Sequence, residues 1–181
     1  MEELDQVALA RARRGDEGAF AALVRHYDTG LRRLAYRLLG DRARMDDALQ
    51  EAYLSAYRAL PRFRGDSSLG TWLYRIAYNA CLDELKRTRE VVDLESVRDR
   101  AQADGDPIDA LSLRQTLAAA LTALPLEDRT AVLLVDANGF DYRSAAEVLG
   151  IPEGTVASRL NRARAALRQT LQNERKGASN R

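Results

Sequence analysis

Two glycines and nearby hydroxyl residues stand together in the stretch GDSSLGTW, Gly65 to Trp72, and this spacing suggests a phosphate-binding loop. A nucleotide-binding loop of that kind needs a lysine directly after the second glycine, to reach the terminal phosphates, and then Ser or Thr for the magnesium ion. Thr71 and Trp72 occupy these positions here. Because the lysine is missing, the sequence disfavours a nucleotide-binding enzyme built on this loop.

A second candidate for chemistry is the combination of Cys81 and His26, the single cysteine and the single histidine of the chain. One thiol cannot form an intramolecular disulfide or a cysteine zinc cluster, and one distant histidine makes a poor catalytic partner for it. We therefore expect both residues to be structural, and we expect no metal, no cofactor, no small-molecule substrate and no enzymatic activity.

A concentration of positive charge near the C-terminus indicates nucleic-acid binding. Six Lys and Arg residues stand against two Glu residues between Glu153 and Lys176, where we expect a helix over 153–171. Such a helix has the electrostatic character of a phosphate-binding surface, and residues near its N-terminus could reach base edges in a major groove. These residues are Thr155, Ser158, Asn161 and Arg162. The alternative is a solvated arginine face on an ordinary bundle helix.

The residues before this helix have the spacing of a helix-turn-helix motif. Ala146 allows two helices to cross closely, Gly150 supplies the turn, and Val156 packs the second helix onto the first. Pro152 stands where a new helix begins, because the first turn does not need its N–H group. The motif and the basic helix together favour DNA binding.

A polar stripe is predicted on an earlier helix, WLYRIAYNACLDELKR, which starts at Trp72. At about 100° per residue, Arg75, Asn79 and Lys86 share one stripe, with Trp72 and Asp83 at its edge. Further arginines and aromatic residues surround the stripe: Arg62, Phe63, Arg64, Tyr74, Tyr78, Arg87 and Arg89. Positive charge with aromatic platforms is typical of single-strand binding. The alternative is that the aromatic residues belong to the core.

The elements that position these residues are helices, since Ala, Leu, Arg and Glu dominate and strand-like alternation is missing. The predicted fold class is all-α, with two small helical domains at 1–89 and 111–175 and a disordered tail at 176–181. Helices are expected at roughly 16–39, 45–60 and 70–88. The segment 90–110 between the domains carries seven acidic residues against two arginines, which indicates a flexible acidic linker.

The composition is that of a globular protein, with 181 residues, 46% hydrophobic and 30% charged, and a net charge of +1. No run approaches the roughly 20 apolar residues of a membrane helix, and the charged N-terminus lacks the apolar core of a signal peptide. We expect a cytoplasmic protein with no membrane insertion.

The chain resembles an extracytoplasmic-function (ECF) sigma factor of the sigma-70 family, the two-domain kind that directs bacterial RNA polymerase to promoters. GDEGAFAALVRHY resembles the start of the sigma-two domain and DDALQEAYLSAYRAL its polymerase-binding helix. FRGDSSLGTWLYRIAYNACLDELKR resembles the promoter-melting segment. LPLEDRTAVLLV and GIPEGTVASRLNRARAALR resemble the sigma-four domain.

The resemblance implies a binding surface for each partner. The residues implied in binding core polymerase, through the clamp helices of its largest subunit, are Asp46, Asp47, Gln50 and Glu51. Those implied in holding the unpaired minus-ten strand are Arg64, Ser67, Ser68, Trp72, Arg75, Asn79, Asp83 and Lys86. Those implied at the minus-thirty-five element of promoter DNA are Thr155, Ser158, Arg159, Asn161, Arg162 and Arg164.

The resemblance further implies that the second-largest subunit's flap is a partner and that the acidic linker threads toward the active-site cleft of the polymerase. Many relatives are held by an anti-sigma factor, although nothing in this sequence specifies one. Ala157 replaces a residue that is commonly basic in the family, so the minus-thirty-five preference of relatives does not carry over directly. The alternative function is a stand-alone helix-turn-helix regulator whose first domain is a sensor or a dimerisation module.

Overall fold

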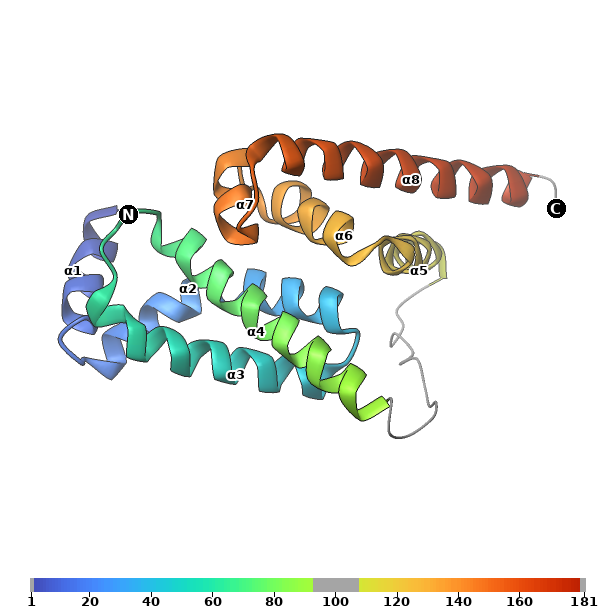
Figure 1. The fold of residues 1–181 in the computed structure, drawn as a ribbon. Coiled ribbons are helices and arrows are strands. Elements are labelled where there is room, and N and C mark those ends of the chain that lie inside the picture. The colour runs from blue at the N-terminus through green and yellow to red at the C-terminus, as the bar shows by residue number, and fades with distance from the viewer. Residues whose placement is uncertain (1, 93–107, 180–181) are drawn as a thin grey trace. The chain divides into compact units, whose positions relative to one another are not determined.

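The computed structural model describes the backbone of residues 2–92 and 108–179 and the side chains of residues 6–88 and 115–172. All regular secondary structure in these residues is helical, which confirms the predicted all-α class. The chain divides into two compact units (Figure 1). Within the described residues, no helix is long and apolar enough to span a bilayer.

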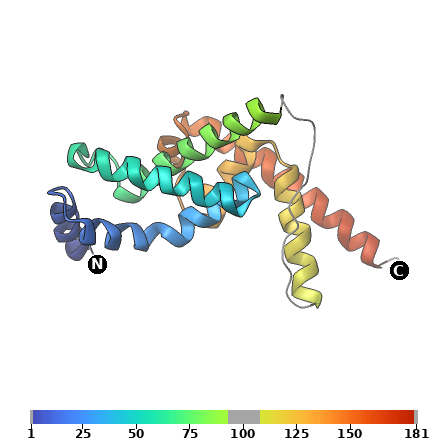
Figure 2. The same ribbon diagram turned by 90° about the horizontal axis from the view of Figure 1, so that it is seen from below.

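The N-terminal unit consists of four α-helices and one 3₁₀ turn. They are α1 (Glu2–Ala12), α2 (Glu17–Leu39), α3 (Arg42–Ala59), the turn η1 (Leu60–Arg62) and α4 (Leu69–Val92). Helices α2, α3 and α4 run alongside one another, and α1 lies at one end of them (Figure 2). Helix α1 was not predicted from the sequence.

Aspartate caps fix where two of these helices begin. Asp16 accepts a hydrogen bond from the backbone N–H of Ala19 at 2.9 Å, and Asp41 accepts one from the backbone N–H of Arg44 at 2.8 Å. Gly40 ends α2 with φ +70°, a conformation that few residues other than glycine adopt without strain. The predicted turn at Gly40 and Asp41 is therefore confirmed, and α3 begins a few residues earlier than expected because Asp41 caps it.

The core of the N-terminal unit is made of leucines from several helices, including Leu31, Leu34, Leu49 and Leu60, each 1% exposed. Burying one such side chain contributes about 1.5–3 kcal/mol. Cys81 is fully buried in this unit, and desolvation raises the pKa of its thiol to about 12. The expectation that Cys81 is structural agrees with this burial.

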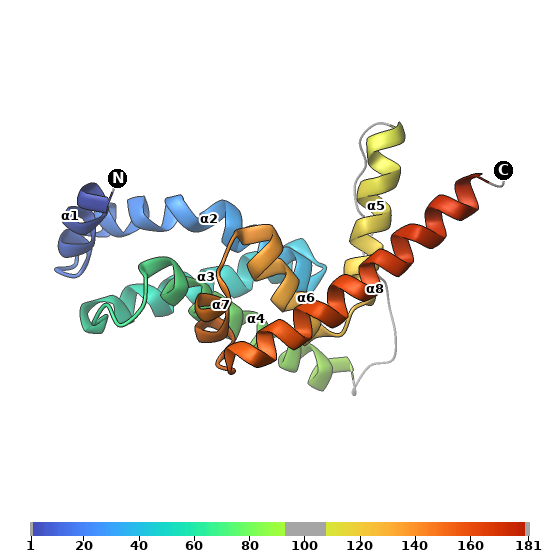
Figure 3. The same cartoon turned by 90° about the horizontal axis from the view of Figure 1, so that it is seen from above.

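The C-terminal unit consists of α5 (Ile108–Ala123), α6 (Leu126–Val132), the π-helical turn η2 (Leu133–Ala137), α7 (Tyr142–Leu149) and α8 (Glu153–Ser179). Helices α5 and α6 both pack against α8 (Figure 3). Gly150 ends α7 with φ +66°, and Ala146 and Val156 are buried on either side of the turn. The predicted helix-turn-helix is confirmed.

Several helices extend further than predicted. Helix α4 continues to Val92 and α5 begins at Ile108, so both enter the segment expected to be linker; residues 93–107 lie outside the described residues. Helix α8 continues to Ser179 through most of the segment expected to be a disordered tail. No proline interrupts α8 after Glu153, and each added residue of a formed helix gains a backbone hydrogen bond.

Candidate nucleic-acid interface

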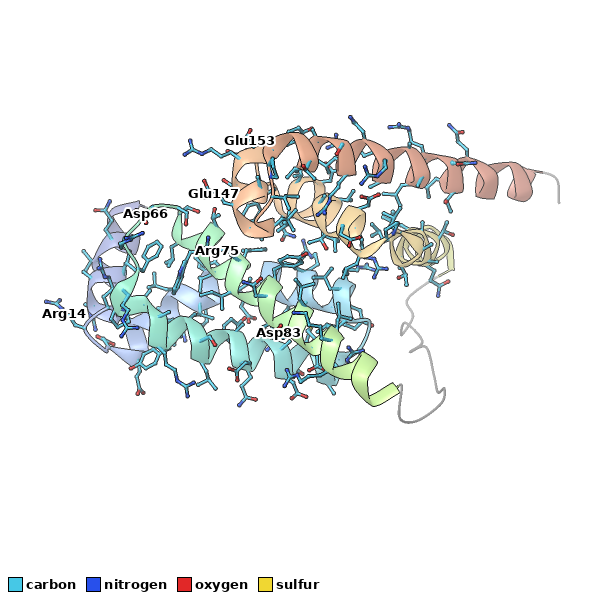
Figure 4. The ribbon with its side chains drawn as sticks, viewed as in Figure 1. Arg14, Asp66, Arg75, Asp83, Glu147 and Glu153 are labelled. Atoms are coloured by element: carbon cyan, nitrogen blue, oxygen red, sulfur yellow. The ribbon has the colours of Figure 1, made fainter. Side chains whose placement is uncertain are left out.

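A polar stripe runs along the exposed side of α4. Arg75, Asn79, Asp83 and Lys86 are all exposed, as the helical spacing predicted. Figure 4 labels two of them, Arg75 and Asp83, on this helix. Lys86 Nζ lies 3.2 Å from Asp83 Oδ1, and both side chains are largely exposed, so this ion pair is readily exchanged for a contact with another molecule. The stripe thus offers one amide, one carboxylate and two cations to solvent.

The loop that precedes α4 contains an exposed ion pair and a hydroxyl that caps the helix. Arg64 and Asp66 form an ion pair of 3.0 Å with side chains 82% and 74% exposed, and Gly65 between them has φ +81°. Ser68 Oγ accepts a hydrogen bond from the backbone N–H of Thr71 at 3.0 Å. The Ser68 hydroxyl is therefore committed to the start of α4, whereas Arg64 remains open to solvent.

Ser67 lies between these two features. Its hydroxyl donates a long hydrogen bond of 3.4 Å to the carbonyl oxygen of Ser68. Because that bond is near the limit of hydrogen-bond geometry, the Ser67 hydroxyl is free to exchange it for a base or phosphate. Of the two predicted serines, Ser68 is the more exposed but its hydroxyl is used at the start of α4, and Ser67 is half-buried with a weakly bonded hydroxyl.

Trp72 lies in the core and not on the polar stripe. It is 9% exposed, and its ring packs against that of Phe63 with 5.1 Å between the ring centroids. Residues from α1, α2, α3 and η1 surround it: Ala12, Ala19, Leu23, Ala56 and Leu60. The helical spacing predicted Trp72 at the edge of the stripe, but the other helices cover this end of α4 and bury the indole. The indole therefore packs beneath the loop that precedes α4.

The residues predicted to bind polymerase lie on one face of α3. Asp46 differs from the others because it forms an ion pair with a residue of α2. Asp47, Gln50 and Glu51 are exposed. Asp46 Oδ1 accepts a hydrogen bond of 2.6 Å from Arg32 Nη1 of α2, and the pKa of Arg32 is raised mainly by this bond. Asp46 is therefore already paired within the unit.

A short network behind this face holds α2 against α3. Asp28 accepts hydrogen bonds from the Tyr53 hydroxyl at 2.7 Å and from Arg32 Nε at 3.1 Å. Burial, together with this bond to a carboxylate, raises the pKa of Tyr53 well above its ordinary value. The network fixes Arg32, and through Arg32 it fixes the position of Asp46.

Leu54 lies on the same face of α3 and was not predicted. It is one turn beyond Gln50 and Glu51, and it is 45% exposed. An exposed leucine next to three exposed polar residues gives the face an apolar centre, which is typical of protein interfaces. Leu54 follows Asp47 by seven residues, or two helical turns, and this spacing was the signal in the sequence that both lie on the same face.

The predicted base-reading residues lie in the first turns of α8. Ser158, Asn161 and Arg162 are exposed, Thr155 and Arg159 are half-buried, and all five lie on or beside one side of the helix. The Ser158 hydroxyl donates to the carbonyl oxygen of Thr155 at 2.9 Å. This surface is polar and carries two cations.

Arg164 lies on the opposite side of α8 from Thr155. Its Nε donates to Asp136 Oδ2 at 3.0 Å and its Nη2 to Asp136 Oδ1. The bonds to Asp136 and Tyr142 raise the pKa of Arg164. Arg164 therefore lies apart from the other predicted residues of α8, and its hydrogen bonds to Asp136 hold α8 against η2.

No group of three or more His, Cys, Asp or Glu side chains in the described part of the chain is arranged to hold a metal ion. The loop at Gly65 lies before a helix and is preceded by the helical turn η1, so it lacks the strand that leads into a nucleotide-binding loop.

Two family models match the chain in the order that the two units suggest. Residues 23–91 match sigma-70 region 2, and residues 114–167 match sigma-70 region 4. The first match contains the α3 face and the α4 stripe, and the second contains the helix-turn-helix. Together they cover most of the chain.

Whole-chain comparisons agree with these matches. The chain is 40% identical to the ECF RNA polymerase sigma factor SigM of Mycobacterium tuberculosis, over 94% of this chain and 86% of that protein. It is 38% identical to the RNA polymerase sigma-H factor of Pseudomonas aeruginosa, over 94% and 95%. Its fold matches the sigma factor RpoE of Bartonella quintana, solved with the anti-sigma factor NepR, with a TM-score of 0.75, 30% identity and coverage of 84% and 96%. The chain is therefore a member of the sigma-70 family, of the ECF type.

Proposed function

We propose that this ECF sigma factor binds core RNA polymerase through α3, recognises minus-thirty-five duplex DNA through α8, and holds the unpaired minus-ten strand on α4. Sigma factors are transcription initiation factors and not enzymes, and we extend this to the present chain, which makes and breaks no bond. Its place of action is the cytoplasm, where polymerase and promoter DNA are found.

One observation carries this proposal. Each region matched to the sigma-70 family presents an exposed polar helix face whose chemistry suits the partner: Arg75 and Asn79 on α4, and Ser158, Asn161 and Arg162 on α8. An exposed amide and cations suit unstacked bases and phosphates, and residues at the N-terminus of a recognition helix suit base edges in the major groove.

The polymerase contact is assigned to Asp47, Gln50, Glu51 and the apolar Leu54. Two carboxylates one turn apart suit an arginine-bearing helix, and a partly exposed leucine supplies apolar area to bury. Asp46 contributes less in this proposal because Arg32 already neutralises it. Contact of the C-terminal unit with the flap of the second-largest subunit, and passage of the acidic linker through the polymerase, belong to the same proposal on family grounds.

An anti-sigma factor is the further partner that we propose. Support comes from RpoE of Bartonella quintana, which was solved in complex with the anti-sigma factor NepR and is 30% identical to this chain. Such a partner would compete with the polymerase for the α3 face or with DNA for α4 or α8.

The proposal is tested by gel filtration of the chain with core polymerase. A stoichiometric complex is expected for the wild type, and Glu51→Lys should abolish it by placing a cation before a cationic partner helix. Glu17→Lys, the same charge reversal at an exposed residue of α2, is the matched control and should retain the complex. A wild-type chain that binds promoter duplex but forms no complex with core polymerase would instead be a stand-alone regulator.

A further inference from the structure

Arg162 of α8 is held by a carboxylate that lies 34 residues earlier in the chain, on α6. Its Nε donates to Asp128 Oδ2 at 3.1 Å and its Nη2 donates to Asp128 Oδ1 at 2.7 Å. These two hydrogen bonds form the bidentate arrangement that gives an arginine–carboxylate pair a defined geometry. The guanidinium plane of Arg162 is therefore fixed relative to α6.

The two partners differ sharply in burial. The Asp128 side chain is 8% exposed, whereas the Arg162 side chain is 60% exposed. A buried carboxylate on a packed helix cannot follow a moving partner, so it fixes the arginine and not the reverse. An exposed arginine without such a partner loses many rotamers on binding, and holding it beforehand lowers that entropic cost.

The pair leaves the outer edge of the guanidinium available. Arginine has five N–H donors, and Asp128 takes one on Nε and one on Nη2. The remaining donors lie on Nη1 and on the far side of Nη2, which is the edge that directs two parallel hydrogen bonds at O6 and N7 of guanine. Arg162 shares its helix face with Ser158 and Asn161 in the first turns of α8, where recognition helices contact base edges.

We propose that Asp128 is a positioning residue for promoter recognition, which aims the outer edge of Arg162 at a guanine of the minus-thirty-five element. This inference rests on the proposed function. Asp128 itself does not touch DNA, because it is buried beneath the arginine.

Loss of the Asp128 carboxylate would have a different effect on DNA binding if the ion pair only neutralised the charge of Arg162. Removing the carboxylate would then free a cation and strengthen binding to every sequence through the phosphates, with a steeper dependence on salt. Positioning predicts that removing the carboxylate weakens the preference for one base. The two effects differ in sign, so one measurement distinguishes them.

The test uses the full chain assembled with core polymerase. Duplexes randomised over the minus-thirty-five region are first selected for binding to this holoenzyme. The affinity of the selected duplex is then measured at fixed salt. It is compared with the affinities of duplexes in which each guanine in turn is replaced by another base or by 7-deazaguanine. The variants are Asp128→Asn, Arg162→Ala and both together. Glu127→Gln is the matched control, since it removes one negative charge from the neighbouring residue, which acts on Arg162 only through space.

For Asp128→Asn we expect a roughly tenfold loss of discrimination at one guanine. Arg162→Ala should lose discrimination at the same guanine, the double variant should lose no more than Arg162→Ala alone, and Glu127→Gln should retain it. Unchanged discrimination in Asp128→Asn, or tighter binding to all duplexes, would overturn the proposal. If Arg162→Ala weakens all duplexes equally, the arginine contacts phosphate only and the proposal is also overturned.

A second variant covers the case in which Asp128→Asn does not fold. Asp128→Glu keeps the negative charge but moves the carboxylate by one methylene, so the bidentate pair is displaced and the same discrimination should be lost while Arg162 stays in place. Retained discrimination in this variant would contradict the proposal. A wild-type holoenzyme that selects no duplex refutes the proposed function, whereas selection that is indifferent to both variants refutes the role of Asp128 alone.

Discussion

The indole of Trp72 packs against the phenyl ring of Phe63, with 5.1 Å between the ring centroids and 45° between their planes. This contact lies beneath the loop that leads into α4, so the loop rests on an aromatic core. Trp72→Ala should lower the free energy of unfolding by about 3–5 kcal/mol, because a large buried side chain leaves a cavity. Thermal or urea unfolding measures it, with Trp72→Phe as the control that retains an aromatic ring. A loss below about 1 kcal/mol for Trp72→Ala would contradict the burial.

Substitution of Asn79 on the exposed stripe should leave stability unchanged and impair function. Asn79→Ala should change the free energy of unfolding by no more than about 0.5 kcal/mol, as is usual for a surface position. Promoter opening should nevertheless fall, because the amide is lost from the surface proposed to hold the unpaired strand. Permanganate reactivity of minus-ten thymines measures opening. The matched control is Asn161→Ala, which should weaken binding of duplex DNA but retain promoter opening at saturating holoenzyme. Full thymine reactivity in Asn79→Ala would rule out a role of Asn79 in holding the unpaired strand.

Gly70 approaches the ring of Tyr27 too closely for a larger residue. A β-carbon at position 70 would lie 2.9 Å from Tyr27 Cε1, so the ring would have to move. Gly70→Ala should cost about 1–3 kcal/mol of stability through overpacking. Gly154→Ala is the control, since a β-carbon there meets nothing within 4 Å, and it should stabilise α8 by about 0.5–1 kcal/mol. If both substitutions had the same effect on unfolding, the contact with Tyr27 would be refuted.

Cys81 should be unreactive in the folded protein. Its pKa is raised from 9.0 to about 12 by burial, so the reactive thiolate is about a thousandfold scarcer at neutral pH than in an exposed thiol. Because the chain has one cysteine, the reaction with a disulfide reagent reports this thiol alone. We expect negligible reaction before unfolding and one equivalent afterwards. Rapid native-state labelling would be inconsistent with the packing of α4.

Asp141 should make stability depend on pH in the acid range. Its hydrogen bond to the backbone N–H of Ser144, which caps α7, lowers its pKa below the ordinary value of 3.8. The unfolded chain therefore binds a proton at Asp141 more readily than the folded chain does. The stabilisation of the folded state by this cap is complete above about pH 4 and is lost as the pH falls through the lowered pKa. Asp141→Asn retains a capping oxygen but does not titrate. Thermal unfolding between pH 2 and 6 should show a shallower dependence for this variant, and identical profiles would argue against the cap.

The elements that follow local chemistry were predictable from the sequence. Asp41 after Gly40 marks a turn between helices, and Gly150 between Ala146 and Val156 marks the helix-turn-helix, because each depends on residues within a few positions. Helical spacing also placed Asn79 on an exposed stripe correctly. Such features need no knowledge of the tertiary fold.

Features that depend on contacts between distant residues were not predictable. Trp72 is buried because α1 and η1 cover it, and α1 itself was missed. Helical spacing places Arg162 and Arg164 on different sides of α8, but it does not show that Asp128 binds the first and Asp136 the second. Periodicity gives the side of a helix on which a residue lies but not which neighbour covers or binds it.

The most direct test of the central claim is run-off transcription with purified core polymerase, this chain and a pool of bacterial promoter fragments. We predict discrete transcripts that appear only when the chain is present and start downstream of a shared pair of sequence elements. These transcripts should be lost in the Glu51→Lys variant, which we expect not to bind core polymerase. A transcript pattern identical to that of core polymerase alone, with a folded wild-type chain, would contradict the assignment of promoter-directing activity to this protein.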